Sequence, residues 1–341
     1  MRLIALLALM TGTAAADELA SSAARPDYVA TEKLLMWDGR QRLEDRGLTI
    51  DGTYSLDMFA APQLDNRFVA GGLFTLEIDA LDRFHVSAFA IHGGGITDEL
   101  MDVHGVSGNT APRDLRLFEA WGEQPLGPVT VRAGLVAADQ EFVLSDRSGN
   151  LMSATFGITS QFSANVLGPV YPTAAPGATV RVETVPVTAR IGVYDGGLEN
   201  THGIPTALGP ELLAIGEVTA VETFKVGAWH HTTLGKAVYA VADRQLEPDL
   251  GAFARAGYSP DGPVSTYIDA GIRATPRRWR PGDLVSLGIA FAHTGENGAQ
   301  TMLELSYEAQ VRWLSIQPDV QVVMLPERTV LVIATRITVT L

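Results

Sequence analysis

The stretch VLVIATRITVTL at residues 330–341 decides the fold class of this chain. Its odd-numbered positions, Thr335 excepted, are all leucine, isoleucine or valine, whereas the other face carries Arg336, Thr338 and Thr340. Because side chains of a strand point alternately to opposite faces, this apolar face needs an apolar medium beside it. Such a strand at the end of the chain predicts a closed barrel in a membrane, in which the last strand pairs with the first.

The N-terminus predicts export. A basic start at Met1-Arg2 precedes an apolar run at Leu3–Met10, and a small-residue cleavage site ends at Ala16. These are the parts of a secretory signal peptide. Beyond it, no stretch reaches the about 18 consecutive apolar residues of a membrane-spanning helix, so a helical membrane protein is excluded.

The chain divides into three predicted parts. We expect a signal peptide at 1–16, an N-terminal segment at 17–49 with one short helix within 31–46, and a barrel domain at 50–341. From Ile50 onward the sequence is a succession of alternating segments of about ten residues, the length of a transmembrane strand.

Sixteen such segments are predicted. They lie near 50–59, 72–82, 84–92, 115–124, 128–137, 178–184, 188–194, 211–219, 223–232, 236–244, 250–258, 264–274, 284–293, 300–311, 313–323 and 330–341. In the first half of the chain the connections alternate between long and tight, which is typical of an outer-membrane barrel. The fold class is therefore an all-β, antiparallel transmembrane barrel.

Composition narrows the class further. The chain has 341 residues, 46% hydrophobic and 19% charged, which excludes disorder. It has no cysteine, so disulfides and thiolate metal sites are absent. A formal charge of -14 argues against nucleic acid as a partner. Runs of polar residues on one strand face, as in Ser315, Gln317, Asp319 and Gln321, predict a wet interior.

Several segments resemble the carbohydrate-selective porins of the OprB type. They include RLEDRGLTIDGTY at 42–54, LFEAWGEQ at 117–124, VRAGLVAADQEFVLSDRSGNLMSATFG at 131–157 and ELSYEAQVRWLSIQPDVQ at 304–321. The resemblance implies a sixteen-stranded pore of the bacterial outer membrane for passive uptake of small sugars, with no cofactor, metal or catalytic step. Ser153 stands where the family's loop motif is expected to carry an asparagine.

The long connection at 138–177 is the predicted constriction. General porins fold a loop into the lumen here, and this one carries polar groups that include Asp139 and Glu141. Strand parity places a set of arginines on the inner faces, where guanidinium groups can bind paired hydroxyls. The predicted pore-lining residues are Arg132, Asp139, Glu141, Arg181, Arg190, Trp229, Arg255, Arg273 and Asp319, with Arg336 on the same face of the last strand.

Pairing with Glu141, Asp269 or Asp319 is expected to orient these arginines. Substituting Arg132 or Arg181 by alanine is expected to alter sugar flux without unfolding the barrel. Trp229 can stack on a sugar ring, and Trp121 is placed on the opposite face of its strand from Phe118. For both tryptophans, anchoring the barrel at the membrane interface is the favoured role.

Other functions remain open from the sequence. A general or anion-preferring porin fits the same architecture, and so does a barrel closed to solutes that serves a structural role. His85 and Ser87 share an inward face, as in outer-membrane phospholipases, but polar lining is the favoured interpretation. Sugars and outer-membrane lipid are the predicted partners, and the sequence leaves open whether the barrel is a monomer or a homo-oligomer.

Overall fold

The structure is a computed structural model that describes residues 33–35, 38–166, 168–197, 208–221, 223–276, 280, 282–295 and 298–341. The expected signal peptide at 1–16 lies outside the described residues. In the part of the chain that is described, no helix is long and apolar enough to cross a membrane.

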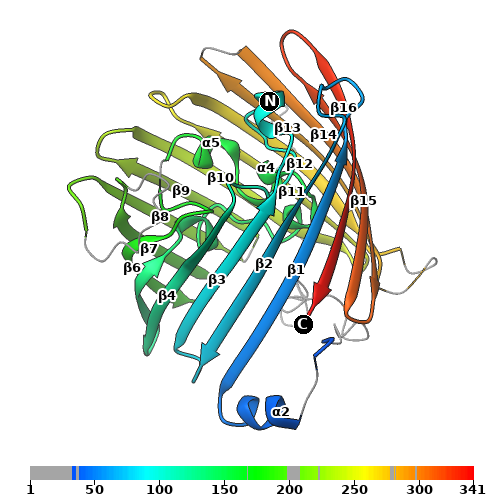
Figure 1. Ribbon diagram of the computed structural model, residues 1–341. Helices are drawn as coiled ribbons and strands as arrows, with labels where there is room; N and C mark the ends of the chain where they lie inside the picture. Colours follow the sequence, from blue (N-terminus) through cyan, green and yellow to red (C-terminus); the bar gives the residue numbers. More distant parts are fainter. Residues whose placement is uncertain are drawn as a thin grey trace.

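The described residues form one closed barrel of antiparallel strands (Figure 1). The sixteen strands are β1 (Leu48–Ala60), β2 (Phe68–Ala80), β3 (Phe84–Gly93), β4 (Asp114–Leu126), β5 (Val129–Val136), β6 (Ala175–Thr184), β7 (Val187–Asp195), β8 (Leu212–Ala220), β9 (Phe224–His231), β10 (Gly235–Glu247), β11 (Leu250–Tyr258), β12 (Val264–Ala274), β13 (Leu284–Thr294), β14 (Gly298–Val311), β15 (Leu314–Met324) and β16 (Thr329–Thr340). Strand β1 pairs with β16, with Asp57 opposite Arg336. The predicted number of strands and the closure of the last strand on the first are confirmed.

Short helical segments interrupt the connections. Helix α2 (Asp38–Glu44) precedes β1, and α3 (Thr97–Leu100) lies between β3 and β4. Between β5 and β6 lie η2 (Ala138–Gln140), η3 (Ser148–Asn150), α4 (Ala154–Gly157) and α5 (Ser160–Ser163). Helix α2 falls within the stretch 31–46 where one short helix was expected.

Strand β15 shows how alternation sorts the two faces of the wall. Ile316 and Val320 are 38% and 42% exposed, whereas Gln317 and Asp319 between them are 5% and 2% exposed. This is the inverse of a soluble protein, because the apolar face is turned outward and the polar face inward. An outward apolar face is stable only against lipid.

Strand β2 begins earlier than predicted. The sequence pattern placed its start at 72, but the strand runs from Phe68 through Gly71 and Gly72. A Cβ on Gly71 would lie 2.5 Å from the carbonyl oxygen of Gly94, so the neighbouring backbone comes close here. Glycine in this strand therefore marks a close approach of two segments and not a turn.

The segment before β1 forms hydrogen bonds with both strands at which the barrel closes, β1 and β16. Arg40 on α2 donates to the carbonyl oxygens of Leu341 at 3.0 Å and Ile50 at 2.7 Å. The Leu34 amide donates to the Thr340 carbonyl at 2.9 Å. In Figure 1, α2 lies below the barrel at the same end as the label C. These bonds tie the end of β16 to the start of β1.

The interior is in part a packed core. Phe59, Met152, Phe156 and Val332 are among the buried residues of one apolar cluster inside the barrel. The prediction of a wet lumen from the polar inner faces did not include this filling by the chain. Many inward polar groups bind chain segments folded into the barrel.

Candidate functional site

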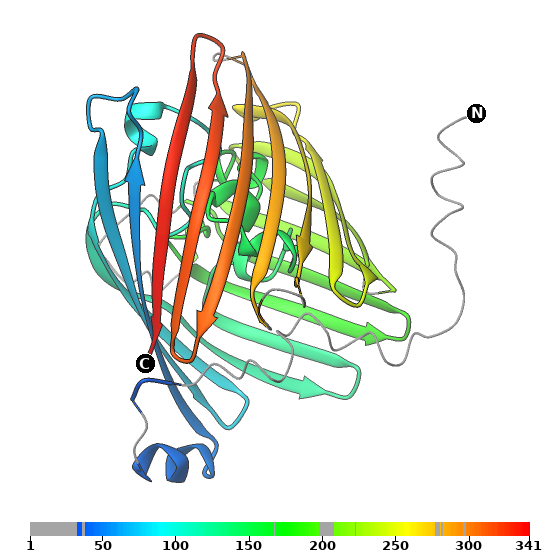
Figure 2. The same ribbon diagram turned by 90° about the vertical axis from the view of Figure 1, so that its right-hand side faces the viewer.

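The connection between β5 and β6 folds into the barrel (Figure 2). We call residues 137–174 the inner loop; residue 167 lies outside the described residues. Its phenylalanines Phe142, Phe156 and Phe162 are 0% exposed and belong to the apolar clusters inside the wall. This confirms the prediction that part of 138–160 enters the lumen.

Carboxylates of the wall hold the inner loop by its backbone. Glu217 on β8 accepts from the amide of Val143 at 3.1 Å, and Glu304 on β14 accepts from Ser153 at 3.0 Å. Asp243 on β10 accepts from the amide of Arg147 at 3.1 Å. A buried amide must find an acceptor, and a carboxylate is a strong one. The acidic inner faces therefore position this loop.

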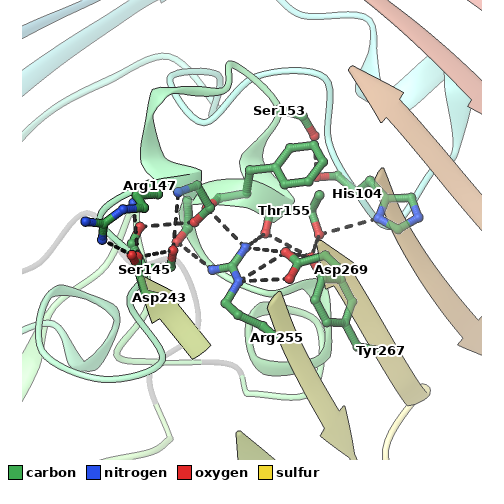
Figure 3. Close-up of polar contacts among 12 residues, drawn as sticks. His104, Ser145, Arg147, Ser153, Thr155, Asp243, Arg255, Tyr267 and Asp269 are labelled. Carbon is green, nitrogen blue, oxygen red and sulfur yellow. Dashed lines mark hydrogen bonds and ion pairs between the residues drawn. The ribbon is translucent and has the colours of Figure 1, made fainter. Parts of the chain in front are cut away.

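Arg255 supplies the matching donors from β11 (Figure 3). Its guanidinium donates to the carbonyl oxygens of Thr155 at 2.8 Å, Phe156 at 3.1 Å and Gly157 at 3.3 Å. Asp269 on β12 lies 2.6 Å from the same group, as the sequence predicted. The side chain of Arg255 is 1% exposed. A planar fork of five donors is suited to three carbonyls and a carboxylate at once.

Tyr267 completes the cluster in Figure 3. Its hydroxyl donates to Asp269 at 2.7 Å and accepts from the Thr155 hydroxyl at 2.9 Å. On the other side of Thr155, the Nδ1 atom of His104 lies 3.4 Å from the hydroxyl oxygen. Burial lowers the pKa of His104 to about 4, so this ring is neutral at pH 7. The cluster therefore joins two loops and two strands without exposing a reactive group.

The remaining predicted arginines also lie on the inner face. Arg132 lies 2.8 Å from Glu123 and 3.1 Å from Glu141, and Arg181 lies 3.0 Å from Glu183. The expected pairing of an arginine with Glu141 is confirmed.

Two further arginines bind backbone of the inner loop. Arg190 donates to the carbonyl of Glu141, and Arg273 donates to that of Asp146 at 2.9 Å. The side chains of Arg132 and Arg181 are 18% and 29% exposed, far more than that of Arg255.

The predicted carboxylates have different surroundings. Asp139 accepts from the Tyr171 amide at 3.0 Å, and burial raises its pKa to about 7. Asp319 makes no ion pair among the residues that the structure describes. Arg336 lies on the inner face, as expected. Its partner is Asp57 on β1, at 2.7 Å, and not Asp319.

Both tryptophans point into the barrel, so the favoured role at the membrane interface is wrong. Trp229 is 2% exposed, and its ring packs edge-on against Phe162 of the inner loop at 6.2 Å. Trp121 lies under Arg132, whose guanidinium carbon is 3.7 Å from the ring centre. A β-bulge between β3 and β4 shifts the alternation, so Phe118 and Trp121 both face inward. Strict parity had placed those two residues on opposite faces.

A cavity of ≈ 710 Å³ remains between the inner loop and strands β2, β3 and β4. Its wall side includes Thr75, Glu77, His85, Ser87 and Glu119. Its loop side includes Asp139, Gln140, Asp146, Tyr171 and Pro172. A second cavity of ≈ 490 Å³ lies by the connection between β3 and β4 and shares Ser107, Thr110 and Ala154 with the first. The two cavities adjoin, and they form the candidate route through the lumen.

The connection between β3 and β4 also enters the barrel, although no sequence pattern indicated this. Val106 is 0% exposed, and the Ser107 hydroxyl donates to Asp57 at 2.5 Å. The Ser153 hydroxyl of the inner loop donates to the Gly105 carbonyl at 2.6 Å. Serine thus serves as a bridge between the two inward segments at the position where the family motif was expected to carry asparagine.

Some cavity residues were missed in the sequence. Glu77, Glu119 and Lys225 were not among the residues predicted to line the pore. Glu77 and Glu119 line the cavity, and Lys225 donates to the carbonyl of Leu144 at 2.9 Å. Alternation gives the direction of each side chain, but not the partner opposite it.

The His85 and Ser87 pair does not form a nucleophile with its base. The Nδ1 atom of His85 lies 2.8 Å from Asp79, and the Ser87 hydroxyl accepts from the Glu119 amide at 3.2 Å. Within the described residues, no group of three His, Cys, Asp or Glu side chains could hold a metal ion. Both residues line the cavity, as the polar-lining interpretation predicted.

Solved structures of outer-membrane channels share this fold. Pseudomonas putida OprB superposes with a TM-score of 0.80 at 14% identity, over 89% of this chain and 96% of that one. A mutant of the Rh. blastica porin gives a TM-score of 0.57 at 9% identity, over 86% of this chain and 100% of that one. The channel DcaP of Acinetobacter baumannii gives 0.52 at 10%, over 86% and 97%. No curated protein sequence matches the chain.

A closed barrel with an apolar outer face and a lumen narrowed by an inward loop defines a porin, a channel of the bacterial outer membrane. Residues 77–230 and 213–341 match the carbohydrate-selective porin, OprB family. The chain belongs to this family, and its function is the passive, carbohydrate-selective diffusion of solutes.

Proposed function

We propose that small sugars cross the barrel through the ≈ 710 Å³ cavity between β2–β4 and the inner loop. The observation that carries this proposal is the polar lining on both sides of the cavity. Thr75, Ser107, Asn109 and Gln140 offer hydroxyl and amide groups that can exchange hydrogen bonds with sugar hydroxyls. A solute that loses part of its hydration in a narrow passage needs such replacements.

Aromatic side chains provide a second kind of contact. Phe118 and Tyr171 line the same cavity, and their rings lie 6.0 Å apart in an edge-on arrangement. An aromatic face can contact the apolar face of a sugar ring. Trp229 is covered by the inner loop, so in this structure it packs against the loop and does not face the cavity.

The wall arginines act on sugars indirectly in this proposal. Arg190, Arg255 and Arg273 donate to carbonyls of the inner loop, and Arg132 pairs with Glu141 of that loop. These contacts fix the loop, and the loop sets the width of the passage. Asp139 is the predicted site residue that also lines the cavity. The outward apolar face contacts outer-membrane lipid, and passage requires no covalent step.

Cysteine chemistry tests the route, because the chain contains no cysteine of its own. Thr75→Cys would place a thiol in the cavity, and Leu76→Cys would place one on the opposite face of β2 as a matched control. Each purified, folded variant is measured for glucose uptake in liposome swelling before and after reaction with a bulky, water-soluble thiol reagent.

Modification of Thr75→Cys should slow glucose uptake, whereas treated Leu76→Cys should transport at its untreated rate. Comparing the same folded protein before and after reaction separates blockage from misfolding. Complete modification of Thr75→Cys with unchanged glucose uptake would show that sugars take another route.

A further inference from the structure

The cavity carries negative charge from both of its sides. Glu77 and Glu119 reach it from strands β2 and β4, and Asp139 and Asp146 reach it from the inner loop. Among the described residues that line it, none is a lysine or arginine, and His85 is the one histidine. That histidine lies 2.8 Å from Asp79, so a proton on it would be matched by a carboxylate.

Basic residues of the wall bind the backbone of the inner loop or a buried carboxylate. Lys225 and Arg273 donate to carbonyls of Leu144 and Asp146, at 2.9 Å each. Arg255 is buried against Asp269 and the loop backbone. In the part of the chain that the structure describes, the Glu77 and Asp146 side chains, both exposed, have no ion-pair partner. The cationic groups therefore hold the loop, and the passage keeps the unbalanced carboxylates.

Asp139 gives an independent indication that the cavity receives a hydrogen-bond donor. This side chain is 3% exposed and lines the cavity, and its Oδ1 atom has no hydrogen-bond partner among the residues that the structure describes. Its other oxygen accepts from the Tyr171 amide. A buried carboxylate oxygen without a donor is costly, and a donor on a passing solute can relieve it.

We propose that this passage selects by charge, favouring cationic solutes over anionic ones, and that amino sugars cross it more readily than sugar acids or sugar phosphates. The selecting groups are Glu77, Glu119 and Asp146, joined by Asp139 when its carboxyl group is ionised. Acidic side chains around a pore raise the local concentration of cations, and low-dielectric walls strengthen their field. Neutral sugars feel no net force and still pass. This inference rests on the proposed route through the cavity.

The test combines ion selectivity with sugar flux. Reversal potentials in a KCl gradient across a planar bilayer give the ratio of cation to anion permeability. Liposome swelling compares glucose, glucosamine and gluconate. We expect a ratio well above one, and uptake of glucosamine severalfold faster than that of gluconate.

Glu77→Gln and Asp146→Asn remove one charge each from opposite sides of the cavity. Either variant should lower the permeability ratio severalfold and bring the uptake rates of glucosamine and gluconate closer together. Asp82→Asn is the matched control, because it removes the same charge in the turn between β2 and β3, away from the cavity. Its ratio should equal that of the parent.

Glu77→Cys provides a second arm that does not depend on how the variants fold. Reacting the folded variant with a sulfonate-bearing thiol reagent should restore the preference for cations, and an ammonium-bearing reagent should reverse it. Glucose uptake by the parent with a ratio at or below one would overturn the charge selection alone. Absence of glucose uptake by the parent would overturn the proposed function instead.

Discussion

Arg255 and Asp269 are register partners on neighbouring strands, and their side chains form an ion pair of 2.6 Å that is almost wholly buried. The guanidinium uses its remaining donors on three successive carbonyls of the inner loop. The pair therefore joins the wall to the element that narrows the lumen. Charged groups inside this barrel therefore stabilise the position of the inner loop, and they are not all available to contact the solute.

Arg255→Ala should loosen the inner loop and destabilise the barrel. The change leaves Asp269 buried without its cation and removes one donor from each of three carbonyls, a loss of about 3–5 kcal/mol for a broken buried pair. Guanidinium titration in detergent measures the free energy of unfolding, and single-channel recording should show larger or noisier conductance. Arg67→Ala, at an exposed arginine in the β1–β2 connection, serves as control. Parental stability in Arg255→Ala would contradict this account.

Arg132→Ala and Arg181→Ala should alter glucose flux without unfolding the barrel. Arg181 is 29% exposed, so its loss should cost no more than about 1 kcal/mol. Arg132 holds Glu141 of the inner loop at 3.1 Å, so its variant should change flux more than that of Arg181. Liposome swelling and heat resistance of the folded band measure the two effects. If both variants keep the parental rate and saturation, these arginines have no part in selectivity.

Asp139 predicts a dependence of stability on pH. Burial raises its folded-state pKa from 3.8 to about 7, so the folded protein binds this proton more tightly than the unfolded chain. The contribution of this group to stability is therefore complete below about pH 4 and is lost as pH rises to about 7. The upper limit is on the order of 4 kcal/mol by linkage. Asp139→Asn should remove this part of the pH profile in guanidinium titrations.

The ionisation of Asp139 should also change the ion selectivity of the barrel. Above about pH 7 the Asp139 carboxylate adds one negative charge to a cavity that already holds Glu77, Glu119 and Asp146. The ratio of cation to anion permeability should therefore rise between about pH 6 and pH 8. In Asp139→Asn the ratio should change less over this range. An equal rise in parent and variant would assign the titration to another group.

Gly288→Ala should disturb the inner loop through packing. A Cβ at this inward position on β13 would meet Leu151 at 2.6 Å and Phe156 at 2.7 Å. Overpacking of this kind costs about 1–3 kcal/mol unless the loop shifts. Gly216→Ala on β8 is the matched control, because the nearest atom to its Cβ is 3.8 Å away. Reduced stability or changed conductance in Gly288→Ala alone is the expected result, and identical behaviour of the two variants would contradict it.

The wall of this barrel could be predicted from sequence because lipid imposes a rule on each residue separately. A strand that crosses the membrane must place an apolar side chain outward at every second position, and this rule is visible in a few consecutive residues. The predicted limits of 250–258 and 264–274 coincide with β11 and β12. The β-bulge that turns Trp121 inward broke the alternation and left no mark in the local pattern.

The sequence by itself determined the barrel, the number of its strands and the inward direction of most wall residues, the wall arginines among them. Only the tertiary structure decided what those residues meet. Glu304 accepts from Ser153, which lies 151 residues away in the chain, and Gln321 donates to the carbonyl of Val106 over 215 residues. Such contacts depend on where two segments fold inside the closed ring. Strand alternation is a local response to lipid and contains no information about that folding.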